Sequence, residues 1–307
     1  MKVSSSLQNL IIRSLAETAT VEIMETLVKE LVPNYDLWKR TGFPLNIPIP
    51  NRDAARQICR DMINLEILPH FISLLIEINT RGYFGREIKI SYLREIIREI
   101  YEHGFIFDNV NRILVEDPNI RRTRNWGVLR ISKEYVLTFL RLDIVGNSEL
   151  VRKYPEEVVT ATYQDLLEIV ERSIEKRNGR IWNWEGDGGL VAFYFSNKNK
   201  LAVLSGMEIL HELFLYNQMK CRLEHPLGVR LAIHTGYCDY TENVEDLNKN
   251  ETIKAVIDIE SRFTNPNTLT ASLNIHSSLD GELAKNFITI TGERGMKYFN
   301  YHMKWEQ

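Results

Sequence analysis

The chain has little cysteine, no long apolar run and no excess of charge of one sign. Its 307 residues include three cysteines, Cys59, Cys221 and Cys238. An odd number without paired spacing argues against a disulfide framework and fits a reducing compartment. The set His211, Cys221, His225 and Cys238 fits no usual zinc-site spacing. The formal net charge of −3 gives no global electrostatic reason to expect a nucleic-acid or membrane partner.

No segment has the composition of a membrane span or a targeting peptide. The start, Met1 to Glu17, lacks an uninterrupted apolar core of signal-peptide length. The most apolar stretch, Ile67 to Ile78, is too short to span a bilayer, and it contains Pro69. The basic cluster Arg121-Arg122-Thr123-Arg124 could contact phosphate, but it also fits a solvated linker. These features predict a cytoplasmic protein that binds neither nucleic acid nor membrane.

The chain divides into two regimes of different periodicity. Residues 1–104 have apolar side chains at helical spacing, and we expect a small helical domain there. Asn51 is the expected N-cap of one helix, with Asp53 in its first turn, and Gly104 ends the last helix. We predict a linker over residues 105–134. No catalytic motif is visible in this first part.

From residue 135 to 307, strands and helices alternate. The first expected strand, Tyr135 to Leu142, is almost continuously apolar, as a buried sheet requires. The expected elements are strand 135–142, helix 155–177, strands 180–185 and 190–195, helix 200–218 and strand 229–235, with a helix at 253–263 and strands at 287–291 and 296–301. The first six follow the order β-α-β-β-α-β, which predicts a ferredoxin-like α/β (α+β) fold.

Two aspartates end neighbouring strands of that fold. Asp143 follows the apolar run Phe139 to Leu142, and Asp187 lies in the turn Trp184-Glu185-Gly186-Asp187-Gly188-Gly189. Each could simply begin a turn. However, the first strand and the central hairpin are neighbours in a ferredoxin-like sheet, so the two carboxylates can approach each other. Carboxylates held that close repel unless a cation intervenes, which predicts a site for hard divalent cations that bind phosphates.

Four segments resemble, in order and spacing, the successive motifs of class III nucleotide cyclases over about residues 135–301. They are Asp143-Ile144-Val145-Gly146, Glu185-Gly186-Asp187-Gly188, Val229 to Gly236, and Ile257 to Arg262. The resemblance implies a head-to-tail homodimer with nucleoside triphosphate sites at its interface. It also implies that Asp143 and Asp187 bind two Mg²⁺ or Mn²⁺ ions, with the Ile144 carbonyl as another ligand. The ribose 3′-hydroxyl would then attack the α-phosphorus and expel pyrophosphate.

Other site residues follow from the same motifs. Val145, Gly146 and Asn147 turn into a helix, so their backbone N–H groups are candidates to bind the triphosphate. The resemblance gives Asp258 the place of the family's ribose-orienting Asn and Arg262 the place of its transition-state Arg. Both would act in the opposite protomer's site. The alternative for this pair is an exposed ion pair on one helix face.

Asn183 stands where adenylate cyclases of the family carry Lys and guanylate cyclases carry Glu. Its amide can match the O4 and N3–H edge of uracil or, flipped, the reversed edge of cytosine. The companion base-reading position falls at Glu251 or Thr252. Arg180 is a possible base or phosphate contact, or else a solvated charge. The purine-reading pattern is therefore absent.

Two tryptophans, Trp182 and Trp184, flank Asn183 and are expected to face the other way, into the core. The family's triphosphate-binding Lys has no clean counterpart, since Arg294 and Lys297 only lie near its position and Tyr237 replaces an Arg of some members. A class III cyclase without the purine pattern resembles the pyrimidine cyclases of Pycsar anti-phage defence, in which cyclic CMP or cyclic UMP activates a separate effector protein.

The sequence thus favours a pyrimidine nucleotide cyclase, with UTP ahead of CTP as its substrate. Two alternatives stay open at this point. One is an adenylate or guanylate cyclase with an atypical base pocket. The other is a degenerate, non-catalytic module that senses nucleotide or mediates dimerisation, an idea motivated by Asp258 and by the missing phosphate-binding Lys.

Overall fold

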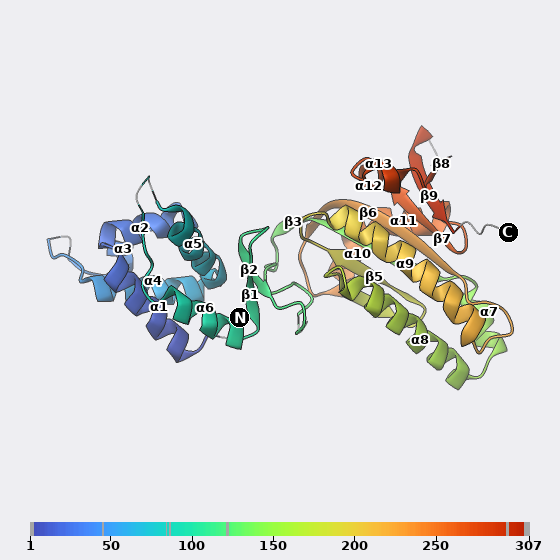
Figure 1. Cartoon of the computed structure of the whole chain (residues 1–307), viewed down its shortest axis with the longest axis horizontal. Coiled ribbons are helices and arrows are strands. Elements are labelled where there is room, and N and C mark those ends of the chain that lie inside the picture. The colour runs from blue at the N-terminus through green and yellow to red at the C-terminus, as the bar shows by residue number, and fades with distance from the viewer. Residues whose placement is uncertain are drawn as a thin grey trace. The chain divides into compact units, whose positions relative to one another are not determined.

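The computed structural model describes residues 3–44, 46–83, 85, 87–120, 123–292 and 295–303. The chain forms two compact units that divide after Val128 (Figure 1), and each is described here by itself. Within the described ranges, no helix combines the length and the apolar character needed to cross a bilayer.

The first unit is helical, as its periodicity predicts, and it ends in a short hairpin. Its elements are α1 (Ser5–Thr18), α2 (Val21–Lys29), α3 (Leu37–Thr41), α4 (Asn51–Asn64), α5 (Leu68–Arg81), α6 (Leu93–Glu102), β1 (Phe105–Asp108) and β2 (Ile113–Glu116). Helices α1, α2 and α3 begin at the side-chain caps Ser4, Thr20 and Asp36. Such caps satisfy N–H groups that have no partner inside the helix.

The expected N-cap of α4 is wrong by one residue. Pro50 is the N-cap, and Asn51 is the first helical residue. The Asn51 amide instead donates to the carbonyl oxygens of Ala16 and Ala19 at the end of α1, at 3.4 and 3.2 Å. Asp53 does lie in the first turn, as predicted. The side chain therefore ties α1 to α4 rather than capping its own helix.

The hairpin β1–β2 belongs to the first unit. Phe105 and Leu114 are buried in the same apolar cluster as the helices, and the Leu114 N–H donates to Ser73 Oγ of α5 at 2.9 Å. The division after Val128 thus falls within the segment 105–134 for which the sequence predicted a linker.

The second unit is a mixed α/β domain built on one large sheet. Its elements are β3 (Glu134–Ile144), α7 (Asn147–Lys153), α8 (Glu156–Glu175), β4 (Arg180–Glu185), β5 (Gly188–Phe193), α9 (Lys198–Met219), β6 (Val229–Asp239), α10 (Val244–Lys249), α11 (Glu251–Phe263), β7 (Thr268–Ser272), α12 (Leu273–His276), α13 (Gly281–Ala284), β8 (Ile288–Thr291) and β9 (Lys297–His302). The strand order is β4-β5-β3-β6-β7-β9-β8.

The four strands β4-β5-β3-β6 and the helices α8 and α9 have the ferredoxin-like arrangement predicted from the sequence. These strands are antiparallel to their neighbours, and β7 then adds parallel to β6. The first strand, β3, lies in the middle of this group. Because β3 is flanked by β5 and β6, the end of β3 is next to both the central hairpin and the start of β6.

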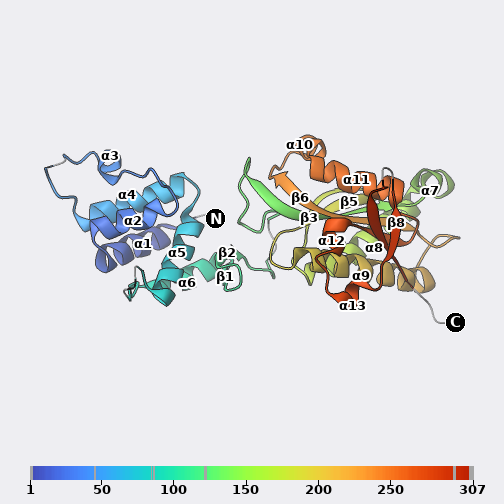
Figure 2. The ribbon, with the colours of Figure 1, turned by 90° about the horizontal axis from the view of Figure 1, so that it is seen from above.

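Helices cover both faces of this sheet, as Figure 2 shows, with α8 and α9 on one side and α11 on the other. The α8–α9 side holds the main apolar core of the unit, to which β3 contributes Leu140, Leu142 and Ile144. The alternate β3 residues, including Arg141 and Asp143, face α11 because side chains alternate along a strand.

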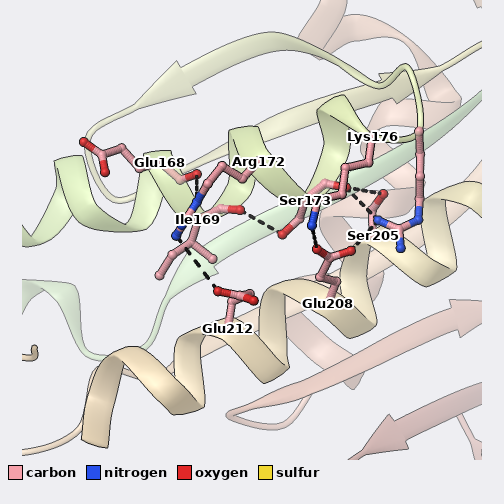
Figure 3. Close-up of polar contacts among 9 residues, drawn as sticks. Glu168, Ile169, Arg172, Ser173, Lys176, Ser205, Glu208 and Glu212 are labelled. Carbon is pink, nitrogen blue, oxygen red and sulfur yellow. Dashed lines mark hydrogen bonds and ion pairs between the residues drawn. The ribbon is translucent and has the colours of Figure 1, made fainter. Parts of the chain in front are cut away.

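An ion-pair network also joins α8 to α9 (Figure 3). Glu208 of α9 accepts from Lys176 Nζ and from Arg177 Nη1, each at 2.5 Å. Ser173 and Ser205 are fully buried where the two helices meet, and the Ser205 hydroxyl donates to the Ser173 carbonyl at 3.3 Å. This network lies on the face of the sheet opposite α11.

Candidate active site

The structure brings Asp143 and Asp187 to the same end of the sheet. Asp143 on β3 pairs in register with Gly188 on β5, and Asp187 directly precedes Gly188 in the hairpin turn. A Cβ atom on Gly188 would lie 2.2 Å from the Leu142 carbonyl oxygen. Only glycine lets the hairpin come this close to β3. Asp143 and Asp187 therefore lie beside each other in the sheet, as the topology predicts, and their role as a cation site stays a prediction.

Each of these carboxylates is fixed through one oxygen. Asp143 Oδ2 accepts from Arg230 Nη2 at 2.5 Å. Asp187 Oδ2 accepts from the Asn147 amide at 2.9 Å, and Asn147 Oδ1 in turn accepts from the Tyr163 hydroxyl at 2.5 Å. Among the described residues, neither Oδ1 atom receives a hydrogen bond. Both carboxylates are therefore oriented, and each keeps one oxygen for a ligand.

This donor set fits hard divalent cations. Two oriented carboxylate oxygens and a nearby backbone carbonyl are the oxygen ligands that Mg²⁺ and Mn²⁺ prefer. The two chain segments are also tied together, since the Ile144 N–H donates to the Asp187 carbonyl at 3.0 Å. In the described ranges, no group of three or more His, Cys, Asp or Glu side chains gathers to hold a metal ion.

The turn after Asp143 is only partly available to phosphate. The Val145 N–H donates to the Gly228 carbonyl at 2.9 Å, so it is committed inside the chain. Gly146, with a φ of +67°, precedes α7. The N–H groups of Gly146 and Asn147 have no acceptor among the residues that the structure describes. Of the three backbone donors predicted for the triphosphate, these two remain candidates.

Two charged residues, the half-buried Arg230 and the buried Glu260, lie beside Asp143 on the α11 side of the sheet. Arg230 is paired with Asp143 across β3 and β6. Its Nε also lies 2.7 Å from Glu260 Oε1 on α11. The two groups form an ion pair, but the orientation of the N–H does not give a hydrogen bond between these atoms. Glu260 is only 4% exposed. Burial, and then the charge of Asp143, raise the pKa of Glu260, while Arg230 and Arg141 oppose that rise.

Asp258 and Arg262 lie on the exposed side of α11. Asp258 Oδ1 and Arg262 Nη1 are 3.1 Å apart, with side chains that are 44% and 47% exposed. The Arg262 guanidinium also lies 5.4 Å from the centre of the Phe263 ring. The two residues therefore share one helix face, as their spacing predicts. Their action in a second protomer's site stays a prediction.

Asn183 lies on the edge strand β4 and lines a small pocket. Its amide donates to Glu185 Oε1 at 2.8 Å. Asn183, Leu190 and Arg141 are paired residues on three adjacent strands, so their side chains share the α11 face. The pocket is lined by Arg141, Asn183, Leu190, Val244, Leu247, Asn248, Ile253 and Ile257. Arg141 Nε is buried there, and it has no hydrogen-bond partner among the residues that the structure describes.

The predicted companion positions do not line that pocket. Glu251 is exposed at the start of α11 and pairs with Lys254 at 2.8 Å. Thr252 is buried, and its hydroxyl donates to the Tyr237 carbonyl at 2.6 Å. The structure instead brings Arg141 and Asn248 together with Asn183. A charged residue inside the apolar strand before Asp143 was the available signal for Arg141, and Asn248 had no signal in the sequence.

Arg180 is buried, with 6% exposure, so the alternative of a solvated charge is wrong. Its guanidinium donates to Asn178 Oδ1 at 2.8 Å and to the Gly179 carbonyl at 3.3 Å. These contacts brace the turn that enters β4. A contact of Arg180 with base or phosphate stays a prediction.

Only one of the two tryptophans faces away from Asn183. The pairing of β4 with β5 shifts between Ile181 and Asn183. Trp182 sits at this irregularity and packs edge-on against Phe139, at 5.3 Å between ring centres. Phe139 is on the same side of β3 as Arg141. Trp184 packs against the α8–α9 core as expected. A bulge places two successive side chains on one face, which strict alternation does not anticipate.

Three residues named in the sequence analysis, Arg121, Arg122 and Arg294, lie outside the described residues. Lys297 is exposed at the start of β9. A zinc site from His211, Cys221, His225 and Cys238 was not expected. The three cysteines are free.

Comparison with known proteins gives matches among solved structures alone. No protein-family model matches this chain, and no curated protein matches it. Similar structures include the adenylate/guanylate cyclase/hydrolase from Silicibacter pomeroyi, at 16% identity over 56% of this chain and 99% of that chain, with a TM-score of 0.47.

The adenylyl cyclase CyaB from P. aeruginosa is 20% identical over 56% of this chain and 96% of that one, with a TM-score of 0.46. The monomeric guanylyl cyclase domain of the RhoGC fusion protein from the aquatic fungus Blastocladiella emersonii is 13% identical over 56% and 98%, with a TM-score of 0.45. Each of these is a nucleotide cyclase domain by its description. At such identities the similarity concerns the fold alone.

Proposed function

We propose that the second unit is a metal-dependent nucleotide cyclase that acts as a homodimer. The observation that carries this proposal is the Asp143–Asp187 pair, in which each carboxylate is held through one oxygen and keeps the other free. The four motifs that resemble class III cyclases support the same reaction. An aspartate that only begins a turn usually bonds to backbone N–H groups nearby in the sequence, whereas these two carboxylates contact the side chains of Arg230 and Asn147.

Asp143 and Asp187, with the Ile144 carbonyl, would hold two Mg²⁺ or Mn²⁺ ions. When bound, such ions neutralise phosphate charge and make a ribose hydroxyl easier to deprotonate. The ribose 3′-oxygen forms a bond to the α-phosphorus, and the bond from that phosphorus to the bridging oxygen of the β-phosphate breaks. Pyrophosphate leaves, and the hydroxyl proton passes to solvent. The N–H groups of Gly146 and Asn147 would donate hydrogen bonds to phosphate oxygens.

Arg262 acts in the site of the other protomer. Its guanidinium is half exposed on α11, so it is accessible to a second chain. In that site it neutralises the charge that develops on the α-phosphate oxygens, which is the usual role of a transition-state arginine. Asp258, which holds Arg262 in the single chain, accepts a hydrogen bond from a ribose hydroxyl.

The substrate that we propose is a pyrimidine nucleoside triphosphate, UTP ahead of CTP. Asn183 reads the Watson–Crick edge of the base. The adjacent Arg141 supplies a buried N–H donor to the same pocket, which suits the C2 carbonyl oxygen that both pyrimidines carry. The product, cyclic UMP, serves as a second messenger in anti-phage defence and is read by a separate effector protein.

The test is product analysis with the purified chain, Mn²⁺ and each of the four ribonucleoside triphosphates. We expect cyclic UMP, with less cyclic CMP, and none from Asp143→Asn. Asp280→Asn is a matched control because Asp280 caps α13 and pairs with Lys200 away from this site. Cyclic AMP or cyclic GMP as the main product would support a purine cyclase. Nucleotide binding without turnover would support a sensing module, and both outcomes contradict the proposal.

A further inference from the structure

The proposed mechanism leaves one buried carboxylate and its arginine partner without a role. Glu260 and Arg230 contribute nothing to the steps above, yet Glu260 is 4% exposed and Arg230 is inserted between it and Asp143. Burying a carboxylate is costly unless it is paired. Such a pair next to a cation ligand needs an explanation beyond stability, because an apolar pair would serve the core at least as well.

The guanidinium of Arg230 bridges two carboxylates on different elements. Its Nη2 lies 2.5 Å from Asp143 Oδ2, and its Nε lies 2.7 Å from Glu260 Oε1. The pairing of Arg230 with Asp143 in the register of β3 and β6 fixes this geometry from the backbone. The planar fork of an arginine keeps the two contacts in a fixed relation. Arg230 therefore determines which oxygen of Asp143 is presented to a ligand.

The charges on this bridge decide how well Asp143 can bind a cation. Arg230 alone would neutralise Asp143 and repel a divalent ion. Glu260 offsets the charge of Arg230 from the far side and competes for the same guanidinium. With Glu260 ionised, the group of Asp143, Arg230 and Glu260 carries a net charge of −1. This negative charge still attracts a divalent cation to Asp143.

We propose that Arg230 and Glu260 are positioning residues that set the orientation and the cation affinity of Asp143. The proposal rests on the metal-dependent function proposed above. Residues that orient a metal ligand and tune its charge act strongly on metal affinity, and their loss typically weakens it about 10–100-fold. Glu260→Gln removes the offsetting charge without changing the side-chain shape. We expect it to weaken Mn²⁺ binding at Asp143 about tenfold.

The chain offers a matched control on the opposite face of the sheet. Glu208 of α9 likewise accepts from two basic side chains, Lys176 and Arg177 (Figure 3), but it touches no residue of the site. Glu208→Gln loses a comparable ion-pair network. A general weakening of the fold would therefore affect both variants, whereas a change in cation binding is expected for Glu260→Gln alone.

The experiment is a titration of the full-length chain with Mn²⁺ alone. The electron paramagnetic resonance signal of free Mn²⁺ reports how much of the ion is bound, so the measurement needs no turnover. Wild type, Asp143→Asn, Glu260→Gln, Glu260→Asp and Glu208→Gln are compared. We expect Mn²⁺ binding that Asp143→Asn removes, Glu260→Gln weakens about tenfold, and Glu208→Gln leaves unchanged. Glu260→Asp keeps the charge, so we expect this variant to bind Mn²⁺ more tightly than Glu260→Gln. It also tests the role of the charge if the glutamine variant does not fold.

The two proposals fail in different ways. Binding that depends on Asp143 but is equal in wild type, Glu260→Gln and Glu260→Asp would overturn the positioning role and leave the cyclase proposal intact. Binding that is equal in wild type and Asp143→Asn would contradict the cation site itself, and the positioning role would fall with it.

Discussion

Replacing Arg230 with methionine gives the sharpest test of the electrostatics in the second unit. The change leaves Glu260 buried with a side chain only 5% exposed, and it releases Asp143 Oδ2. At an effective dielectric constant of about 20, the 2.7 Å separation of Arg230 and Glu260 corresponds to about 6 kcal/mol of gross attraction. The cost of removing both charges from water offsets part of this attraction. Removing one partner of a buried pair costs about 3–5 kcal/mol.

We expect the lower end of that range, about 3 kcal/mol, because the Arg230 side chain is itself 30% exposed. The cost depends on pH. The pKa of Glu260 is already raised by burial and by Asp143, and losing Arg230 raises it further. A carboxyl whose pKa is raised in the folded state binds its proton on folding, so it favours folding at low pH and disfavours it as pH rises. The destabilisation should therefore be larger at about pH 7.5 than at about pH 5.

The assay is urea unfolding at the two pH values, with Arg262→Met as the control. Arg262 also pairs with an aspartate, but both side chains are about half exposed, so its loss costs less than about 0.5 kcal/mol. Equal free energies of unfolding for the two variants would refute the reasoning. A cost for Arg230→Met that does not change with pH would refute the role assigned to Glu260.

Three further predictions concern the geometry of the site. Gly188→Ala should destabilise the second unit by about 1–3 kcal/mol in urea unfolding, because its Cβ would meet the Leu142 carbonyl; a cost below 0.5 kcal/mol contradicts the tight approach. Asn147→Ala should raise the Mn²⁺ concentration for half-maximal turnover about tenfold by freeing Asp187, and no shift would exclude that role. Asn183→Ala should lower kcat/KM about tenfold for the preferred nucleotide, and an unchanged preference among the four nucleotides would contradict base reading.

The sequence predicts most of the second unit because its strands and long helices have strong patterns. The hairpin strand at 180–185 matches β4, and the helix predicted from Pro155 matches α8. Strand β7, Thr268–Ser272, was missed because a run of Thr, Leu, Ala and Ser has little apolar contrast. The helix expected after the turn at Val145 and Gly146 begins at Asn147 as α7. The short helix α10 was missed, since one or two turns give no periodicity to detect.

The site residues that could be predicted from the sequence are carboxylates at the ends of strands. Asp143 and Asp187 each follow an apolar strand, and the topology alone makes them neighbours. Arg230 and Glu260 were missed because charged residues are expected on the surface, and only the register of β3 with β6 shows that Arg230 lies opposite Asp143. A charge between the buried residues of strand β6 was the available signal.

The side chains that surround Asn183 in its pocket could not be predicted from the sequence. Thr252 was a reasonable companion for Asn183 by its position in the motif, yet its hydroxyl is committed to the backbone of β6. Which side chains converge with Asn183 depends on how α10 and α11 cross the sheet. That crossing is decided by packing between segments far apart in sequence, so no local pattern encodes it.

We propose that one active site needs Asp143 from one chain and Arg262 from another. Mixing Asp143→Asn with Arg262→Met tests it directly, by assaying cyclic nucleotide release from each variant alone and from an equal mixture after subunit exchange. We predict no activity from either variant alone and about a quarter of wild-type activity from the mixture, because half of the dimers then carry one intact site. A mixture as inactive as its components, in which mixed dimers are shown to form, would contradict a site shared between two chains.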